Sequence, residues 1–173
     1  MAGDKISALL DGTNRRSIGR ANEVVRLVLK DPKLFRELIA CIWHENPLVR
    51  MRAADAVEKI SAERPRLLQP YKSRLLGLLA ETEQTELRWH FAQMVPRLKL
   101  TARERQRAAA ALRHYLDDRS SIVRTFALNA LVELSRHDET LRPEAKHLVE
   151  EALHSGSAAM KARARQLLKI FQD

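Results

Sequence analysis

The chain has 173 residues, enough for a domain with a substantial core, and its 45% hydrophobic and 31% charged residues exclude both a disordered chain and a membrane-spanning one. The single cysteine, Cys41, excludes an internal disulfide and a multi-cysteine metal site, while the net charge of +9 would attract polyanions or simply keep the protein soluble. The opening residues lack the pattern of a secretory signal, so we expect a cytoplasmic protein, and no membrane is expected among its partners.

The first helical pattern lies near the N-terminus, in the stretch SIGRANEVVRLVLK. Its apolar residues Ala21, Val24, Val25 and Val28 share one helix face. This periodicity predicts a degenerate helical unit over approximately residues 4–30, which would act as a cap for the units that follow.

From residue 31 onward one pattern recurs: a helix, a short polar turn and a second helix. An apolar residue followed by a cation begins each second helix, and the cations Arg50, Arg88, Arg124 and Lys161 are 38, 36 and 37 residues apart. Residues three, seven and ten places after each cation are apolar, which predicts one buried stripe per helix. The units are predicted over approximately residues 31–63, 64–100, 101–138 and 139–173. No segment alternates polar and apolar residues between Gly or Asn turns, so no strand is predicted.

A helical hairpin of this length, in which an apolar residue and Arg lead from a polar turn into an Ala-rich helix, resembles the HEAT repeat. The resemblance covers approximately residues 31–173. It implies an all-α fold, a right-handed α-α superhelix or HEAT-like solenoid of about ten helices in four to five pairs, in a single domain over residues 1–173. The family's turn Asp has a counterpart only in Asp118, so no continuous ladder of Asp between repeats is expected; its place is taken elsewhere by His44, Thr82 and Ser155.

The repeated cation borders the apolar stripe, which leaves two interpretations. Its long side chain either covers the core and donates to carbonyls of the turn or of the neighbouring repeat, or it belongs to a row of anion-binding groups. We favour the first interpretation. Pro96 interrupts a helical stretch and removes a backbone hydrogen bond, so a kink is expected there.

Residues two, five and nine places after each cation lie opposite the buried stripe. In HEAT-like arrays the second helices line the concave side, so the resemblance implies that these residues form the floor of a groove. The candidate partner-binding residues are the basic ones among them, Arg52, Lys59, His90, Arg97 and Arg163. Trp43 is a further candidate, because the other units carry surface residues at its position; it would either anchor a partner or cap the N-terminal unit. An ordinary solvated face is the alternative interpretation of the groove residues.

Catalytic and metal-binding motifs are missing from the sequence. The six histidines include no pair four residues apart with a Glu, none joins Cys41 in a ligand cluster, and no glycine-bearing loop would hold a phosphate. We therefore predict no catalytic residue, no metal and no cofactor. The predicted function is a non-enzymatic protein-interaction module or scaffold, monomeric or weakly oligomeric, that binds an acidic protein or peptide segment in its basic groove.

Two alternative functions remain open. The final helix carries Lys161, Arg163, Arg165 and Lys169 with no acidic residue before the C-terminal Asp, which would allow electrostatic contact with nucleic acid; a solvated basic surface is the interpretation that we favour for it. The resemblance then implies a HEAT-like protein diverged from DNA-repair glycosylases. An accessory subunit of an enzyme is the third interpretation.

Overall fold

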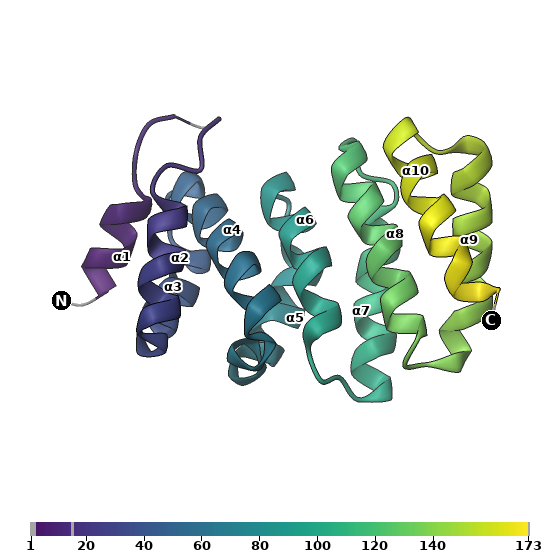
Figure 1. The fold of residues 1–173 in the computed structure, drawn as a ribbon, viewed down its shortest axis with the longest axis horizontal. Coiled ribbons are helices and arrows are strands. Elements are labelled where there is room, and N and C mark those ends of the chain that lie inside the picture. The colour runs from purple at the N-terminus through teal and green to yellow at the C-terminus, as the bar shows by residue number, and fades with distance from the viewer. Residues whose placement is uncertain (1–2, 15, 173) are drawn as a thin grey trace. The chain divides into compact units, whose positions relative to one another are not determined.

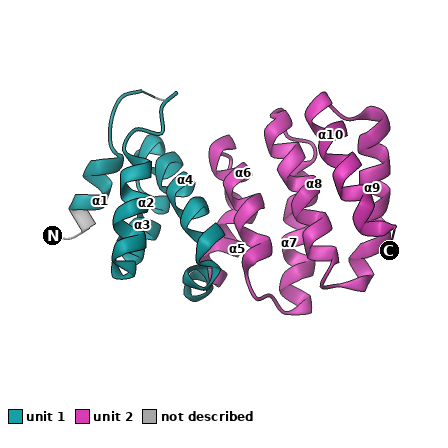
Figure 2. Ribbon diagram, viewed as in Figure 1, with its two compact units in different colours: residues 1–71 teal, residues 72–173 magenta. Residues whose placement is uncertain are grey.

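The structure is a computed structural model that describes residues 3–14 and 16–172. Over these residues the chain forms ten α-helices joined by turns and short 3-10 helices, with no strand, so the predicted all-α fold is confirmed (Figure 1). None of these helices is both long and apolar enough to cross a membrane. The chain divides into two compact units, residues 1–71 and residues 72–173 (Figure 2).

Unit 1 is built from four α-helices and three 3-10 helices. The elements are α1 (Gly3–Leu10), α2 (Ala21–Lys30), η1 (Pro32–Leu34), α3 (Phe35–Ala40), η2 (Cys41–Trp43), α4 (Pro47–Glu63) and η3 (Pro65–Tyr71). The longest helix, α4, packs against α2 and α3, and α1 contacts all three of the others. On α2, Ala21, Val24 and Val28 are buried, as the N-terminal pattern predicts.

Cys41 lies in the core of unit 1, as its position on an apolar face predicts. It is 5% exposed, and its Sγ lies 3.4 Å from the backbone oxygen of Glu37. Burial, together with the negative charge of Glu37, raises the pKa of the Cys41 thiol to about 11. The thiol is therefore protonated at neutral pH, which is typical of a structural cysteine.

Unit 2 consists of three helical hairpins. The elements are α5 (Lys72–Glu81), α6 (Thr85–Met94), η4 (Val95–Arg97), α7 (Ala102–Tyr115), α8 (Ser121–Ser135), η5 (Glu139–Leu141), α9 (Arg142–Ser155), α10 (Ala158–Leu167) and η6 (Leu168–Phe171). The second helix of the middle hairpin, α8, lies between α6 and α10 and contacts both, while α5 packs against α7 (Figure 1). The second helices of unit 2 therefore form one layer, as the repeat predicts.

Local sequence explains where the helices of unit 2 begin. Ser120 accepts a hydrogen bond from the N–H of Val123 at the start of α8, and Ser157 accepts one from the N–H of Met160 at the start of α10. At α7 the N-cap is a capping box formed by Thr101 with the Glu three residues later. These polar side chains satisfy N–H groups that the first turn of a helix leaves without a partner.

The sequence predicts a kink at Pro96, and the structure instead ends the α-helix just before this residue. The α-helix stops at Met94 and continues as the 3-10 helix η4 through Arg97. Because proline has no N–H, it cannot donate the bond that would continue an α-helix. The chain then leaves the hairpin at Leu98 in an extended conformation.

The boundary between the two units falls inside the repeat predicted over residues 64–100, after Tyr71. The cause is η3, which contacts α4 and carries the fully buried Leu68. The ring of Tyr71 also lies 6.0 Å from the ring of Phe35 on α3. The connection that precedes α5 thus packs onto unit 1.

The predicted apolar stripe forms the core of the second helices. Its buried members are Ala53, Val57, Ile60, Phe91, Val95, Leu98, Ala127, Leu131, Leu134 and Ala164. In the last hairpin, Leu168 and Phe171 are only partly buried, because no helix follows α10 and η6 in the part of the chain that the structure describes.

Candidate functional site

The repeated arginines tie each second helix to the turn that precedes it. Nη1 of Arg50 donates to the carbonyls of His44 and Glu45, both at 2.9 Å. Nη1 of Arg124 donates to the carbonyls of Asp118 and Arg119 at 2.6 and 3.1 Å, and Nε of Arg88 donates to that of Thr82 at 2.9 Å. This geometry agrees with the structural interpretation of the column rather than with a row of anion-binding groups.

One arginine of this column also links two hairpins of unit 2. Nη1 of Arg88 lies 2.7 Å from Oδ2 of Asp118, the Asp in the next turn. Burial opposes ionisation of this carboxyl group, but hydrogen bonds from Arg88 and from the N–H of Ser120, with the charges of Arg88 and Arg124, lower the pKa of Asp118. At the following turn the equivalent residue is Ser155, which has no carboxylate. The contact between Arg and Asp is therefore not repeated at that junction, as the sequence predicts.

The prediction that Arg52 lies in an accessible groove is wrong, because this side chain is 3% exposed. Its guanidinium donates to the carbonyl of Leu10 at the end of α1 and to three carbonyls of the loop between α1 and α2. The donors are Nη1 to Leu10 and Asp11, Nη2 to Asn14 and Nε to Ser17, at 2.8–3.0 Å. The loop therefore covers α4 at this position. Carbonyl dipoles within the chain therefore stabilise the charge of Arg52.

Two glycines allow this loop to close on Arg52. Gly12 and Gly19 have positive φ angles of 151° and 54°, and a Cβ atom at either would lie 2.8 Å from the guanidinium. Residues other than glycine rarely adopt such backbone conformations, and a side chain at either position would also collide with Arg52. Two glycines in the stretch DGTNRRSIG were the sequence signal that a specific loop follows α1.

The other candidates, in η2, α4 and α6, differ in accessibility. Lys59 on α4 donates to Oδ2 of Asp55 at 2.8 Å and to Oδ1 of Asn22 at 2.9 Å, so its charge is already paired. His90 is 7% exposed and its ring lies against that of Trp89, so its prediction as an accessible groove residue is wrong as well. Trp43 ends η2 and is half-buried.

Arg97 and Arg163 converge on one cavity of unit 2. It has a volume of about 360 Å³ and lies on the layer of second helices, with Arg97 from η4, Arg163 from α10 and Phe126 from α8 between them. The complete lining is Gln93, Pro96, Arg97, Phe126, Asn129, Glu133 and Arg163. All of these except Pro96 stand two, five or nine places after a repeated cation, which are the positions that the sequence predicts for the groove. We call this surface the α6–α8–α10 face.

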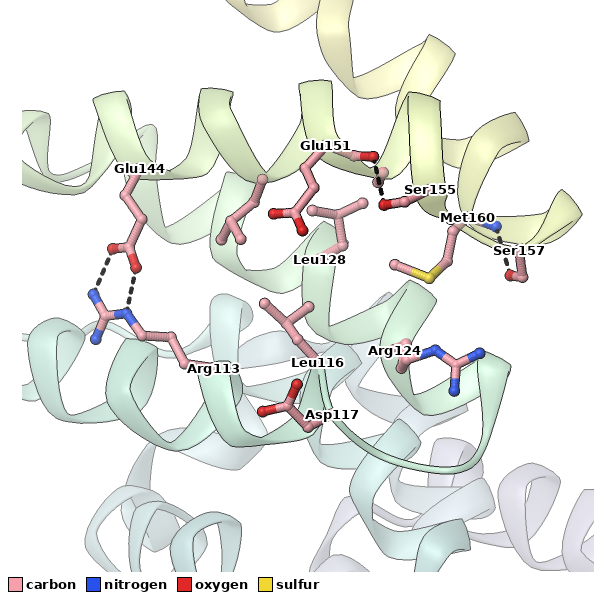
Figure 3. A pocket seen from close by; sticks show the side chains of 13 residues that line it. Arg113, Leu116, Asp117, Arg124, Leu128, Glu144, Glu151, Ser155, Ser157 and Met160 are labelled. Atoms are coloured by element: carbon pink, nitrogen blue, oxygen red, sulfur yellow. Dashed lines mark hydrogen bonds and ion pairs between the residues drawn. The ribbon is translucent and has the colours of Figure 1, made fainter.

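A second cavity of unit 2 was not predicted from the sequence. It has a volume of about 560 Å³ and lies where the α7–α8 turn meets the α9–α10 turn (Figure 3). Leu116, Leu128 and Met160 give it an apolar wall, and the ion pair between Arg113 and Glu144 stands at one end. The hydrogen bond from Arg113 lowers the pKa of Glu144, against the opposing effect of burial. We call it the turn cavity.

No group of three or more His, Cys, Asp or Glu side chains that would hold a metal ion lies within residues 3–14 and 16–172. The cavity of the α6–α8–α10 face is lined by arginines, a carboxylate and amides, and the turn cavity by arginines, carboxylates and serines, and neither lining includes a histidine or a cysteine. The arrangement at both cavities is suited to binding charged groups.

These features define a helical-repeat protein, with one cavity on its second helices and another at its turns. A family model described as a HEAT repeat domain matches residues 10–171, so the chain belongs to the HEAT repeat family. The crystal structure of an engineered protein superposes with a TM-score of 0.66 at 15% sequence identity, covering 98% of this chain and 79% of that one. At this identity the likeness concerns the fold alone. No curated protein is similar enough to this sequence to count as a relative.

Proposed function

We propose that this protein is a non-enzymatic interaction module, cytoplasmic in location, that holds an acidic segment of a partner protein on its α6–α8–α10 face. The observation that carries this proposal is the convergence of Arg97 and Arg163, from different hairpins, on one cavity with Phe126 between them. HEAT repeats typically bind proteins, which is in keeping with a role as a scaffold.

The chemistry of the cavity lining fits such a segment. A guanidinium group presents planar pairs of N–H donors that match a carboxylate, and such charge-assisted bonds are about twice as strong as neutral ones. Asn129 and Gln93 each offer an amide that donates and accepts, which suits the backbone of an extended peptide. The ring of Phe126 and the ring of Pro96 provide apolar contact for a neighbouring side chain.

The charges around the cavity favour a protein segment over a densely charged polymer. Glu133 lies in the same lining and contributes a negative charge among the two arginines. A phosphate backbone would meet this carboxylate at close range, whereas a peptide can place its acidic side chains opposite the arginines alone. Nucleic acid is the second candidate, because α10 and η6 carry Lys161, Arg165 and Lys169 beside Arg163 with no acidic residue among them.

A charge-reversal experiment tests the proposal. The probes are a fluorescent peptide of alternating Glu and Leu, and single-stranded and duplex DNA, each titrated with the full chain at about 50 mM salt. We expect the peptide to bind, and Arg97→Glu with Arg163→Glu to weaken it about a hundredfold, because two attractive contacts become repulsive. Arg103→Glu with Arg107→Glu is the matched control, since both are exposed on α7 and neither lines the cavity.

The outcomes separate the candidate functions. Peptide binding that the control variant weakens as much as the cavity variant would reject the α6–α8–α10 face. DNA binding that exceeds peptide binding, and that falls by about 0.9 log units per phosphate contact for each log unit of salt, would replace the proposal with the nucleic-acid alternative.

A further inference from the structure

The two junctions between hairpins in unit 2 differ at one equivalent position. At the first junction, Arg88 of one hairpin pairs with Asp118 in the turn of the next, at 2.7 Å. At the second junction Arg124 stands where Arg88 stood, but Ser155 replaces the Asp. The second junction therefore has the arginine of this contact between hairpins but lacks the carboxylate that would pair with it.

Arg124 has donors to spare at this junction. A guanidinium group carries five N–H bonds. The two on Nη1 are used by the carbonyls of Asp118 and Arg119. Within the described residues no hydrogen bond or ion pair engages Nε or Nη2, which form the edge that Arg113 uses for its two bonds to Glu144.

The position of this missing ion pair coincides with the turn cavity. Both Arg124 and Ser155 line it, and Figure 3 shows Arg124 beside Met160 and Ser157, at the opposite end from the Arg113–Glu144 pair. Leu116 and Leu128 lie between these two ends. A volume of about 560 Å³ falls in the range of small-molecule sites.

We propose that the turn cavity binds a carboxylate joined to an apolar group, with the carboxylate on the Nε–Nη2 edge of Arg124 and the apolar group against Leu116, Leu128 and Met160. The carboxylate of the ligand would thus pair with Arg124 as Asp118 pairs with Arg88. The same chemistry is present in a free aliphatic acid and in the C-terminal residue of a peptide with an apolar side chain. The proposal does not depend on the α6–α8–α10 face.

The other charged residues of the cavity favour a ligand with one negative charge. Asp117 and Glu151 line the cavity and form no ion pair with any described residue. The charge of Arg113 is already neutralised by Glu144. These two carboxylates repel further negative charge, so phosphate, nucleic acid and dicarboxylates should bind more weakly than a monocarboxylate.

Methyl NMR of the full chain with small probes tests the binding chemistry. We expect hexanoate to shift the methyl signals of Leu128 and Met160 in a saturable way, and hexanamide, which has the same shape without the charge, to bind at least tenfold more weakly. Adipate, with a second carboxylate, should also bind more weakly than hexanoate. Acetyl-Leu-Leu and its C-terminal amide make the same comparison for a peptide ligand. Whichever of hexanoate and acetyl-Leu-Leu binds more tightly identifies the source of the ligand.

A substitution that supplies the missing carboxylate tests the geometry. Ser155→Asp places a carboxylate at the position of Asp118, so it should pair with Arg124 and weaken hexanoate and acetyl-Leu-Leu at least tenfold. His154→Asp is the matched control, since it adds the same charge at the same helix end but lies outside the cavity lining, and it should change the affinity less than about twofold. If Ser155→Asp fails to fold by circular dichroism, Arg124→Gln provides the same measurement.

Three results would overturn the proposal. They are the absence of shifts with both acids up to about 20 mM, equal binding of an acid and its amide, and unchanged binding in Ser155→Asp or, in its place, Arg124→Gln.

Discussion

Arginines only two residues apart on α4 have different roles, which their surroundings decide. Arg50 is half-buried and bonds to the turn before its own helix, whereas Arg52 is buried beneath a loop that lies more than 30 residues earlier in the chain. A buried cation is costly unless its donors are satisfied. At Arg52 the carbonyl at the end of α1 and three loop carbonyls satisfy them, and the loop in turn depends on Arg52 for its shape.

Replacing Arg52 with methionine should therefore destabilise unit 1. Met has a similar length but no donor, so Arg52→Met would leave the carbonyls of Leu10, Asp11, Asn14 and Ser17 without their partner. We expect a loss of about 3 kcal/mol in the free energy of unfolding, measured by urea denaturation, and faster proteolysis within residues 11–20. Arg26→Met on the exposed side of α2 is the control and should change stability by less than about 0.5 kcal/mol. Equal stability of the two variants would contradict the role assigned to Arg52.

At the scale of elements, ion pairs at the turns and first helices add to the apolar packing between hairpins in unit 2. Arg88 pairs with Asp118, Lys72 with Glu104 and Arg113 with Glu144, each linking one hairpin to the next. Exposed pairs of this kind contribute little, but the Asp118 side chain is only 7% exposed. Asp118 also connects two arginines of the repeated column, since its side chain accepts from Arg88 and its backbone carbonyl accepts from Arg124.

The lowered pKa of Asp118 gives a prediction about acid sensitivity. Because its folded pKa lies below the ordinary value of 3.8, the carboxylate stabilises the fold at pH values above 3.8, and this contribution is lost as the pH falls through the folded pKa. Asp118→Asn should therefore cost about 2 kcal/mol in the free energy of unfolding at pH 7, and the difference from the natural sequence should shrink below pH 3.8. Urea denaturation across this range measures it.

A matched variant separates this effect from general acid sensitivity. Asp117→Asn removes a neighbouring exposed carboxylate that forms no ion pair with a described residue, so it should leave stability at pH 7 nearly unchanged. A difference between Asp118→Asn and the natural sequence that stays constant down to the lowest pH would contradict the assignment.

The helices and their buried faces could be predicted from sequence because they depend on local periodicity. Residues three places after the repeated cations, such as Ala53, Phe91 and Ala127, are buried as predicted. Arg97 and Arg163, which stand at predicted groove positions, line the same cavity. The same reasoning failed for Arg52, because the loop that covers it has no periodicity and comes from a distant part of the chain. It also missed the turn cavity, whose lining combines residues of four helices and depends on a residue that is absent, the Asp replaced by Ser155.

At the scale of the whole molecule, the repeat period runs through the chain, but the residues of the buried stripe are not equally buried in every hairpin. In unit 2, α8 contacts α6, α7, α9 and α10, so its apolar stripe supports every element around it. The last hairpin, by contrast, leaves Leu168 and Phe171 partly exposed. In an array that contacts only its neighbours, a central helix therefore has a greater effect on cooperative stability than a terminal one.

Ala127 lies at the centre of this stripe and gives the sharpest test of it. The residue is fully buried on α8, so Ala127→Asp would place an unpaired charge where no water can solvate it. The expected cost of about 4 kcal/mol or more is a large part of the 5–15 kcal/mol that stabilises a typical domain. Because the neighbouring helices pack on α8, amide protection from hydrogen exchange should fall together across α6 to α10. Ala110→Asp on the exposed side of α7 is the control and should leave thermal unfolding nearly unchanged. A variant at Ala127 that melts like the natural sequence, or that loses protection in α8 alone, would show that the stripe does not connect the hairpins.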